Sequence, residues 1–356
     1  MANFLMPVGH TISTDTRETD DALVDTARND VVIERRITVG RGPIGDIAAG
    51  DAGVVVANFG SDSVSILDPA GRALGADVSV EGEPTAVIAT RDRAFVATAS
   101  ASHDAVSVID LETRSVVATF PVAFGVTALA VSPDGKRVYA GRTLGDRVDI
   151  AVIEVVAERV GTIDIGHGPA AAIDALTVDP SGKRLFAAIT DAGGSRLAIV
   201  DAETSRVQRV VAVGSPIRDI AHIDGTVYVL TSDRAVGGAV HVIELSTNKV
   251  TDTVEIGGAP TQLVMSPDHA RAYIVDYDRV VVLCTLSLEV IDALSVDARP
   301  SCVAPGIDGS QLYVADYSGT VNVFSVESTM EMLYSQFLAT DPIALSAPRS
   351  LQPVAV

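Results

Sequence analysis

A unit of some forty residues repeats along most of this chain, and it limits the fold more than any other feature. Tight turns of the Pro-Asp-Gly kind, or their equivalents, fall near Asp51, Asp92, Asp134, Ser181, Asp224, Asp268 and Asp308. Successive turns are therefore separated by 41, 42, 47, 43, 44 and 40 residues, as subtraction of these positions gives. Proline fixes φ at the second turn position, and Asp or Gly tolerates the conformation that follows. The spacing predicts seven units.

Each unit contains four short phrases that are typical of strands. An apolar strand ends in glycine before a loop with proline (Ile37–Pro43), and a second apolar strand closes on the tight turn (Ala128–Gly135). A phrase with an aromatic or aliphatic centre follows (Val138–Gly141), and the last strand ends in an acid (Val106–Asp110). A period in the forties with four strands per unit is the signature of a β-propeller blade. We therefore predict an all-β fold, a seven-bladed β-propeller with four antiparallel strands per blade.

Two segments carry a more specific resemblance. Val55–Asp68, with the core Val-Ala-Asn-Phe-Gly-Ser-Asp-Ser-Val-Ser-Ile, is similar to the YVTN-type propeller repeat, and so is Leu312–Phe324. The similarity extends over about residues 31–338. It implies a seven-bladed ring, but no single activity, because this repeat occurs in surface, binding and redox-associated proteins.

The ends of the repeat region indicate how the ring closes. Ile33–Val39 leads into the first unit in step with the outer strands of the others, whereas Met330–Phe337 also has the pattern of an outer strand. We expect the N-terminal strand to be the outermost strand of the last blade. Residues 1–30 are then a flexible acidic arm, 31–338 the propeller, and 339–356 an extended tail with three prolines and no periodicity.

The composition limits the partners and the compartment. A net charge of −20 argues against nucleic acid and anionic membrane surfaces, because both would repel the protein. No stretch has the roughly 18 apolar residues of a membrane span, and residues 1–10 do not have the pattern of a signal peptide. Two cysteines do not make a disulfide scaffold. We expect a cytoplasmic protein without membrane insertion, either a monomeric ring or part of a larger complex.

The predicted fold gathers two sets of loops on one face around the central channel, where propellers usually bind. The loops that enter the inner strands supply Arg41, Glu83, His167 and Arg299. The loops between the second and third strands supply Asn58, Asp62, His103, Asp104, Arg142, Asp146, Arg147, Asp191, Arg234, Asp276, Tyr277, Asp278, Asp316 and Tyr317. Mixed acids and arginines suit a polar ligand or a protein loop, although ordinary solvated loop residues would have the same composition.

Motifs for metal binding and catalysis are weak. The six histidines are scattered and no cysteine pair has zinc-finger spacing. Asp276, Asp278 and Asp316 could supply carboxylates to a hard cation, but such a site needs about six or more oxygen ligands. No Gly-x-Ser-x-Gly elbow is present, and Cys284 and Cys302 lie in apolar strands, where inert burial is the usual role. We expect no cofactor and name no catalytic residue.

Three functions remain open from the sequence. The first is a non-enzymatic binding or scaffold propeller that docks a protein or peptide on its loop-rich face. The second is a lactonase or related hydrolase of the propeller kind, with a carboxylate-lined channel and a possible metal. The third is a sensor of a small polar ligand. Three or more acids or histidines converging with a cation at the channel mouth would favour the second function.

Overall fold

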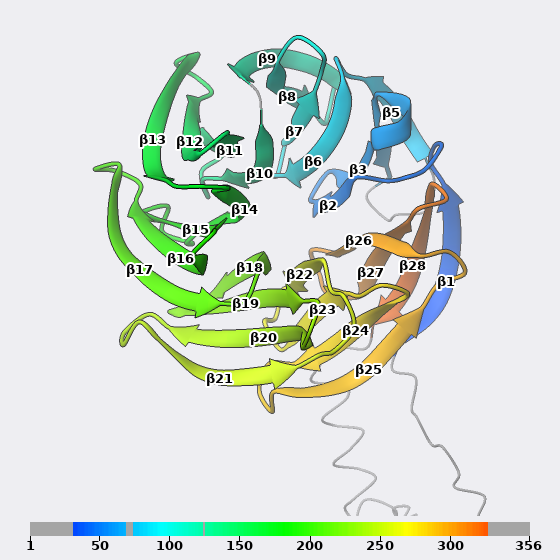
Figure 1. Ribbon diagram of the computed structural model, residues 1–356. Coiled ribbons are helices and arrows are strands. Elements are labelled where there is room, and N and C mark those ends of the chain that lie inside the picture. Colours follow the sequence, from blue (N-terminus) through cyan, green and yellow to red (C-terminus); the bar gives the residue numbers. More distant parts are fainter. Residues whose placement is uncertain (1–30, 69–73, 124, 327–356) are drawn as a thin grey trace, which may run out of the picture.

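The computed structural model describes residues 31–68, 74–123 and 125–326, which form seven four-stranded antiparallel sheets arranged as a ring (Figure 1). Among these residues the only helix is a short 3-10 turn, Phe59–Ser61. The predicted seven-bladed propeller is confirmed. The proposed arm (residues 1–30), the proposed tail (339–356) and the alternative closing strand Met330–Phe337 lie outside the described residues.

The strands take the same place in every blade. The innermost strands are β2 (Asp46–Gly50), β6 (Glu83–Ala89), β10 (Val126–Val131), β14 (Ala172–Val178), β18 (Ile217–Ile223), β22 (Gln262–Met265) and β26 (Pro300–Pro305). The second strands are β3 (Gly53–Asn58), β7 (Arg93–Ala99), β11 (Arg137–Leu144), β15 (Arg184–Asp191), β19 (Thr226–Asp233), β23 (Arg271–Val275) and β27 (Gln311–Asp316).

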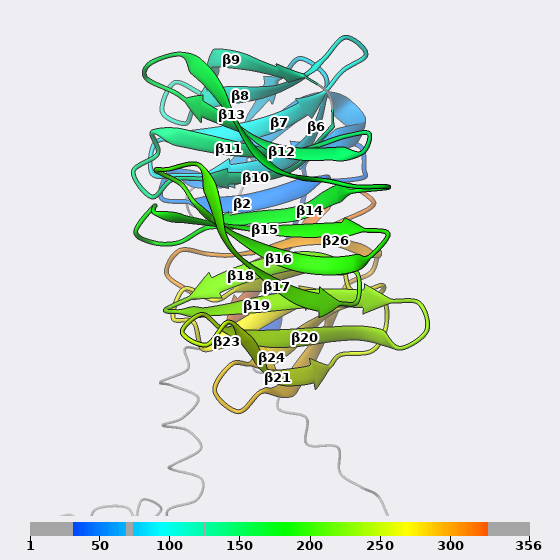
Figure 2. The ribbon, with the colours of Figure 1, turned by 60° about the vertical axis from the view of Figure 1, so that its left-hand side comes forward.

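The outer half of each blade completes the sheet. The third strands are β4 (Ser63–Leu67), β8 (Asp104–Asp110), β12 (Arg147–Glu154), β16 (Gly194–Asp201), β20 (Gly237–Glu244), β24 (Arg279–Cys284) and β28 (Thr320–Val326). The outermost strands are β5 (Leu74–Ser79), β9 (Ser115–Ala123), β13 (Arg159–His167), β17 (Arg206–Gly214), β21 (Lys249–Glu255), β25 (Glu289–Ser295) and β1 (Val31–Thr38). We number the blades 1 to 7 from β2; Figure 2 shows β13, β17 and β21 on the near side.

The ring closes through the N-terminal strand, as predicted. β1 pairs antiparallel with β28, from Val31 opposite Val326 to Thr38 opposite Thr320, and becomes the fourth strand of blade 7. Its end, Val39, donates a backbone hydrogen bond to the carbonyl of Gly319 over 3.0 Å. The two ends of the propeller are therefore held in one sheet, which removes the open edge that an unclosed ring would expose.

The hydrophobic core consists of seven layers between neighbouring blades rather than one central core. Between blades 1 and 2, for example, Val55 and Ala57 of β3 pack with Val87 of β6 and Val96 of β7. Alanine and valine dominate these layers, and their small β-branched or methyl side chains allow sheets to approach closely over flat faces. Each blade is thus buried on both faces by its neighbours, and the inner strands and loops are held rigidly.

Candidate functional site

The loop face carries one cluster that the fold assembles from three separate loops. Arg299, in the loop between β25 and β26, lies between the rings of Tyr277 and Tyr317. The guanidinium carbon is 4.4 Å from the ring centroid of Tyr277 and 4.9 Å from that of Tyr317. Both distances are within the range of a cation–π interaction. All three residues were among those predicted from sequence, and the structure brings them together across blades 6 and 7.

Backbone contacts fix the Arg299 and Tyr317 loops against each other. The amide of Tyr317 donates to the carbonyl of Arg299 over 3.0 Å. The loop after β1 also packs against this point, since a Cβ atom on Gly42 would lie 1.9 Å from the carbonyl oxygen of Tyr317. Only glycine permits such a close approach. It places the exposed residue Arg41, which precedes Gly42, beside the Tyr317 loop.

These two tyrosines differ from every other described tyrosine in their exposure. Tyr277 is 59% exposed and Tyr317 is 47% exposed. Four further tyrosines are buried within the blades, namely Tyr139, Tyr228, Tyr273 and Tyr313. An aromatic ring in water forgoes the stabilisation that burial would give it. The two exposed rings therefore contact Arg299 while leaving apolar surface open.

Three acids of this region, Asp276, Asp297 and Asp316, already have other partners, whereas the exposed Asp278 has no ion pair among the described residues. Asp276 accepts from the amide of Ala259 over 2.7 Å and pairs with Arg279 over 3.3 Å. Asp297 pairs with Arg36 over 2.5 Å. Asp316 accepts hydrogen bonds from the amide and hydroxyl of Ser318, the amide of Thr320 and the side-chain amide of Asn322. Arg299 is exposed and forms no ion pair with any residue that the structure describes.

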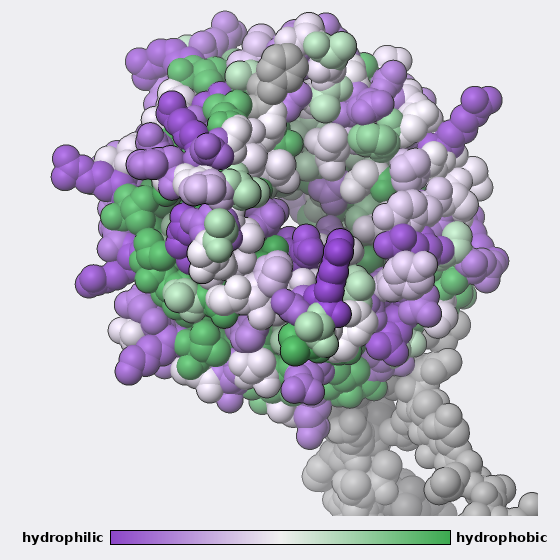
Figure 3. Space-filling view, viewed as in Figure 1, coloured by the Kyte–Doolittle hydropathy of each residue, from purple (hydrophilic) through white to green (hydrophobic). Residues whose placement is uncertain are grey.

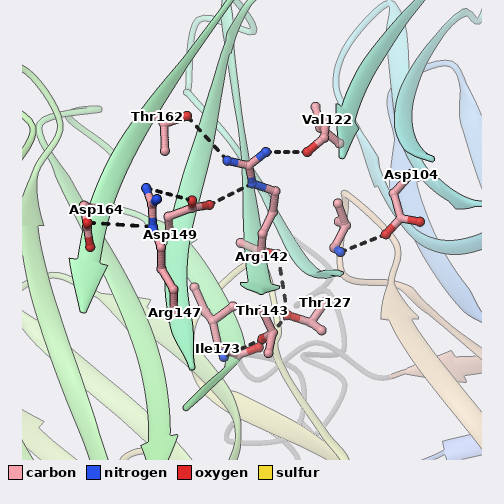
Figure 4. Close-up of polar contacts among 12 residues, drawn as sticks. Asp104, Val122, Thr127, Arg142, Thr143, Arg147, Asp149, Thr162, Asp164 and Ile173 are labelled. Atoms are coloured by element: carbon pink, nitrogen blue, oxygen red, sulfur yellow. Dashed lines mark hydrogen bonds and ion pairs between the residues drawn. The ribbon is translucent and has the colours of Figure 1, made fainter. Parts of the chain in front are cut away.

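The predicted residues Arg142, which is buried, and Arg147, which is exposed, belong instead to an ion-pair network around the buried Asp149 (Figure 4). The Nε of Arg142 on β11 lies 2.7 Å from Oδ1 of Asp149 on β12, and its Nη1 donates to the carbonyl of Val122. Arg147 contacts the other oxygen of Asp149 over 3.3 Å. Arg142 and Asp149 are buried, with exposed fractions of 8% and 1%. This pair stabilises blade 3 and leaves no guanidinium surface for a ligand at Arg142.

Several other predicted residues serve the loops that carry them. Asn58 is buried and donates to the hydroxyls of Ser63 and Ser65. Asp104 is also buried and accepts from the amide of Val126 in the next blade over 3.0 Å. Asp191 pairs with Arg196, and this hydrogen bond holds the pKa of the Asp191 carboxyl below its usual range. These contacts favour structural roles at the three positions.

The remaining predicted residues lie apart from the tyrosine–arginine cluster. His103, in the β7–β8 loop, contacts the hydroxyl of Ser102 over 2.9 Å. His167 ends β13 in blade 3, and Arg234 lies in the β19–β20 loop of blade 5; both are exposed. Asp278 is exposed beside Tyr277. In residues 31–68, 74–123 and 125–326, no three His, Cys, Asp or Glu side chains form a group able to hold a metal ion.

Sequence reasoning missed the acids of the central channel. Asp46, Asp174 and Asp219 lie on three inner strands and line a cavity of about 270 Å³ together with Arg218 and Gln262. At the start of five of the seven inner strands the pairing is irregular, for example between Ile173 and Ala175 on β14 and between Ile217 and Asp219 on β18. Such a bulge turns an extra side chain toward the channel. A single Asp at the start of an apolar strand was the signal available in the sequence.

Two of these carboxylates connect neighbouring blades. Asp46 accepts from the amide of Val87 over 2.9 Å, and Asp219 accepts from the amide of Leu263 over 2.8 Å. Burial raises the pKa of Asp46 to about 6 and that of Asp219 to about 7, against the opposing effect of these hydrogen bonds. Burial also raises the pKa of Asp174, which accepts a hydrogen bond from Thr190. Asp46 and Asp219 therefore link the inner strands of neighbouring blades through hydrogen bonds to backbone amides.

Fold and site together define a class, a closed seven-bladed β-propeller with an open tyrosine–arginine cluster on its loop face. The seven-bladed beta-propeller protein Rv1057 of Mycobacterium tuberculosis is 35% identical over 378 residues, which covers 94% of this chain and 94% of the relative. A seven-bladed beta-propeller protein of Mycolicibacterium smegmatis is 50% identical over 334 residues, 92% of this chain and 91% of the relative. The chain belongs to this family of seven-bladed β-propeller proteins.

Solved structures add support for the fold alone. A chain of the Kuenenia stuttgartiensis hydrazine synthase superposes with a TM-score of 0.72 at 20% identity, covering 82% of this chain and 97% of that one. A chain of a mitotic checkpoint complex gives a TM-score of 0.70 at 15% identity, covering 92% and 100%. No protein-family model matches the sequence. The resemblance to the YVTN-type repeat is therefore not confirmed and stays a prediction.

Proposed function

We propose that this propeller is a binding or scaffold protein that docks a protein or peptide on its loop face. The observation that carries the proposal is the Tyr277–Arg299–Tyr317 cluster, which exposes two aromatic rings and one guanidinium without an ion pair among the described residues. Tyrosine and arginine are enriched among the residues that dominate protein interfaces. In Figure 3 hydrophilic, neutral and hydrophobic side chains are mixed around the hollow centre of the ring.

The rigidity of the cluster supports the same function. The contacts with two rings and the backbone bond between Tyr317 and Arg299 restrict the motion of the guanidinium. Side chains that are ordered before binding lose less conformational entropy when a partner arrives. One structural neighbour was solved within a mitotic checkpoint complex, which fits a ring that assembles with proteins.

The channel supports the hydrolase and sensor alternatives less well. Both carboxylate oxygens of Asp46 and both of Asp219 accept hydrogen bonds from the protein itself. Replacing these bonds with a ligand would leave backbone amides of inner strands without acceptors, which is costly in a buried place.

None of the described residues forms a helix long and apolar enough to span a membrane, and the cytoplasmic location stays a prediction.

A matched pair of surface variants tests the proposal. Tyr277→Ala/Tyr317→Ala removes both rings from the loop face of blades 6 and 7. Leu286→Ala/Ile307→Ala removes two exposed apolar side chains, 77% and 50% exposed, from the opposite ends of the same blades. Each full chain is immobilised and exposed to soluble lysate of its native host, and stoichiometric partners are identified by mass spectrometry.

The result expected is a partner that wild type and the Leu286/Ile307 variant retain and the tyrosine variant loses. Crosslinks from this partner should map to residues of the loop face. Equal capture by all three chains, or crosslinks confined to the opposite face, would show that the tyrosine–arginine cluster is not the docking site.

A further inference from the structure

We infer that the partner presents an acidic peptide segment, and that Arg299 binds one of its carboxylates between the two tyrosine rings. This inference rests on the proposed docking function and adds the chemistry that would recognise the partner. Three independent observations carry it: the stacking of Arg299, the use of the nearby acids by other residues, and the position of Arg41 at the same edge.

The stacking leaves a defined part of Arg299 available. The guanidinium carbon lies over the ring of Tyr277 at 4.4 Å and over that of Tyr317 at 4.9 Å, and neither contact uses an N–H donor in an ion pair. The N–H donors of a guanidinium point outward in its plane. A carboxylate that approaches this edge accepts two parallel hydrogen bonds, a geometry that an ammonium group cannot reproduce.

The charges of the region favour an acidic ligand. The chain contains 46 acidic and 26 basic residues, so an exposed arginine would readily find an acid within the chain. Yet Asp276 is held by Arg279 and Asp297 by Arg36, and the exposed Asp278, next to Tyr277, forms no ion pair with Arg299. Arg299 and Arg41 have no ion pair among the described residues, and the packing of Gly42 on Tyr317 brings the Arg41 loop to the same place. A local basic site thus survives on a protein of net charge −20.

The surrounding surface favours an extended peptide over an isolated anion. Tyr277 and Tyr317 each leave about half of their surface open, at 59% and 47%. These apolar faces would bury the carbon atoms of residues that flank the bound carboxylate. The strong negative charge elsewhere should confine the acidic segment to this cluster, because like charges repel it from the rest of the surface.

Peptide display on the full-length chain tests the inference. A library of random linear peptides is selected on wild type, and only peptides whose binding is lost with Tyr277→Ala are kept. One selected peptide and its counterpart with Asp and Glu replaced by Asn and Gln are then synthesised. Their dissociation constants are measured by fluorescence anisotropy on wild type, Arg299→Gln and Arg299→Lys.

The selected peptides should be enriched in Asp and Glu, and the amide counterpart should bind wild type about ten-fold more weakly or worse, since hydrogen bonds to charged groups are strong. Arg299→Gln should bring the two peptides within about two-fold of each other, and Arg299→Lys should lie between. If peptides bind at the tyrosines with equal affinity in acid and amide forms, the docking face stands and carboxylate recognition is overturned. If no peptide depends on Tyr277, both proposals fail.

The chain's own acidic segment is the competing occupant. Residues 1–30 contain six acids, at Asp15, Glu18, Asp20, Asp21, Asp25 and Asp30. A full-length variant with these six replaced by Asn or Gln should bind the selected peptide as wild type does, within about two-fold. Binding that becomes about ten-fold tighter or more would show that this segment occupies the cluster, and it would overturn the assignment of the site to a partner.

Discussion

Two arginines of the loop face, Arg142 and Arg299, have opposite surroundings. Arg142 is 8% exposed, and its donors are used by Asp149, the carbonyl of Val122 and the hydroxyl of Thr162. Arg299 is exposed, and among the described residues its side chain contacts the rings of Tyr277 and Tyr317. The residue type is the same, and the difference lies in whether the N–H donors already have acceptors.

This difference separates a structural arginine from a binding arginine. A buried charge must be paired, because an unpaired one loses its hydration without compensation. An exposed charge has no such requirement, and its stacking on aromatic rings restricts its motion without consuming its donors. Substitution of Arg142 should therefore lower the free energy of unfolding strongly, and substitution of Arg299 should lower it weakly.

Removing Arg142 should have the largest effect on stability. Arg142→Leu leaves the carboxylate of Asp149 buried, with Arg147 as its remaining ion-pair partner at 3.3 Å. Loss of one member of a buried pair costs about 3–5 kcal/mol, and we expect the lower end of that range because Arg147 compensates in part. Urea unfolding followed by circular dichroism measures the change.

The double variant Arg142→Leu/Asp149→Leu provides the control. Replacing both charges by apolar groups removes the unpaired carboxylate, so stability should return to within about 1–2 kcal/mol of wild type. A single variant as stable as wild type would show that Arg147 alone satisfies Asp149, and the comparison between the two arginines would lose its basis.

The fold could be predicted from the sequence because its determinants are local and repeated. Turns of the Pro-Asp-Gly kind, or their equivalents, and apolar strands recur in the same order seven times. The strand beginning at Ile33 has the position in this order that the outer strands have. Each signal specifies its own hairpin, and the number of repeats then specifies the ring. The N-terminal closure followed from this order and is confirmed by the pairing of β1 with β28.

The candidate site could be predicted only as a set of loops. Arg142 and Arg299 both belonged to the predicted face, but the burial of one and the exposure of the other depend on strands that are distant in the sequence. Asp174 and Asp219 were missed because an irregular pairing at the start of β14 and β18 changes which side chains enter the channel. The stacking of Tyr277 on Arg299 also depends on how two blades pack.

The channel acids should make stability fall as pH rises, the second largest effect. The pKa of Asp219 is about 7 in the folded protein against 3.8 for an ordinary Asp, so the folded state binds more protons between these values. The contribution of Asp219 is thus fully present below about pH 4 and is lost as the pH rises through 7.

Asp219→Asn removes this contribution and tests its sign. Relative to wild type, the variant should gain roughly 1–2 kcal/mol more at pH 8 than at pH 5, because each pKa unit corresponds to about 1.4 kcal/mol and the group is partly exposed to the channel. Asp46→Asn, whose parent carboxyl has a pKa of about 6, should show the same change about one pH unit lower. A gain that is larger at pH 5 would contradict the assignment.

His222 tests a buried group without a partner, and its effect should be smaller. Its ring stacks on Phe186 with centroids 4.9 Å apart, and neither ring nitrogen has a hydrogen-bond partner among the described residues. Burial lowers the pKa of His222 below 6.5, so the unfolded chain takes up the proton first and stability falls as the pH drops below that value. His222→Leu should reduce the fall in stability between pH 7 and pH 5 by about 1 kcal/mol or less. Thermal unfolding of wild type and variant at the two pH values measures this difference.

Arg299→Ala should change stability least. The substitution removes two cation–π contacts at the surface, each worth about 0.5–1 kcal/mol at exposed sites. It also removes the entropy cost of ordering the long arginine side chain, which offsets part of this loss. The free energy of unfolding should therefore fall by less than about 1 kcal/mol, several-fold less than for Arg142→Leu. Partner capture should nevertheless be lost, whereas Arg142→Leu/Asp149→Leu should keep it. A large loss of stability with Arg299→Ala would mean that the cluster holds blades 6 and 7 together, and the open edge of its guanidinium would then be incidental to a structural role.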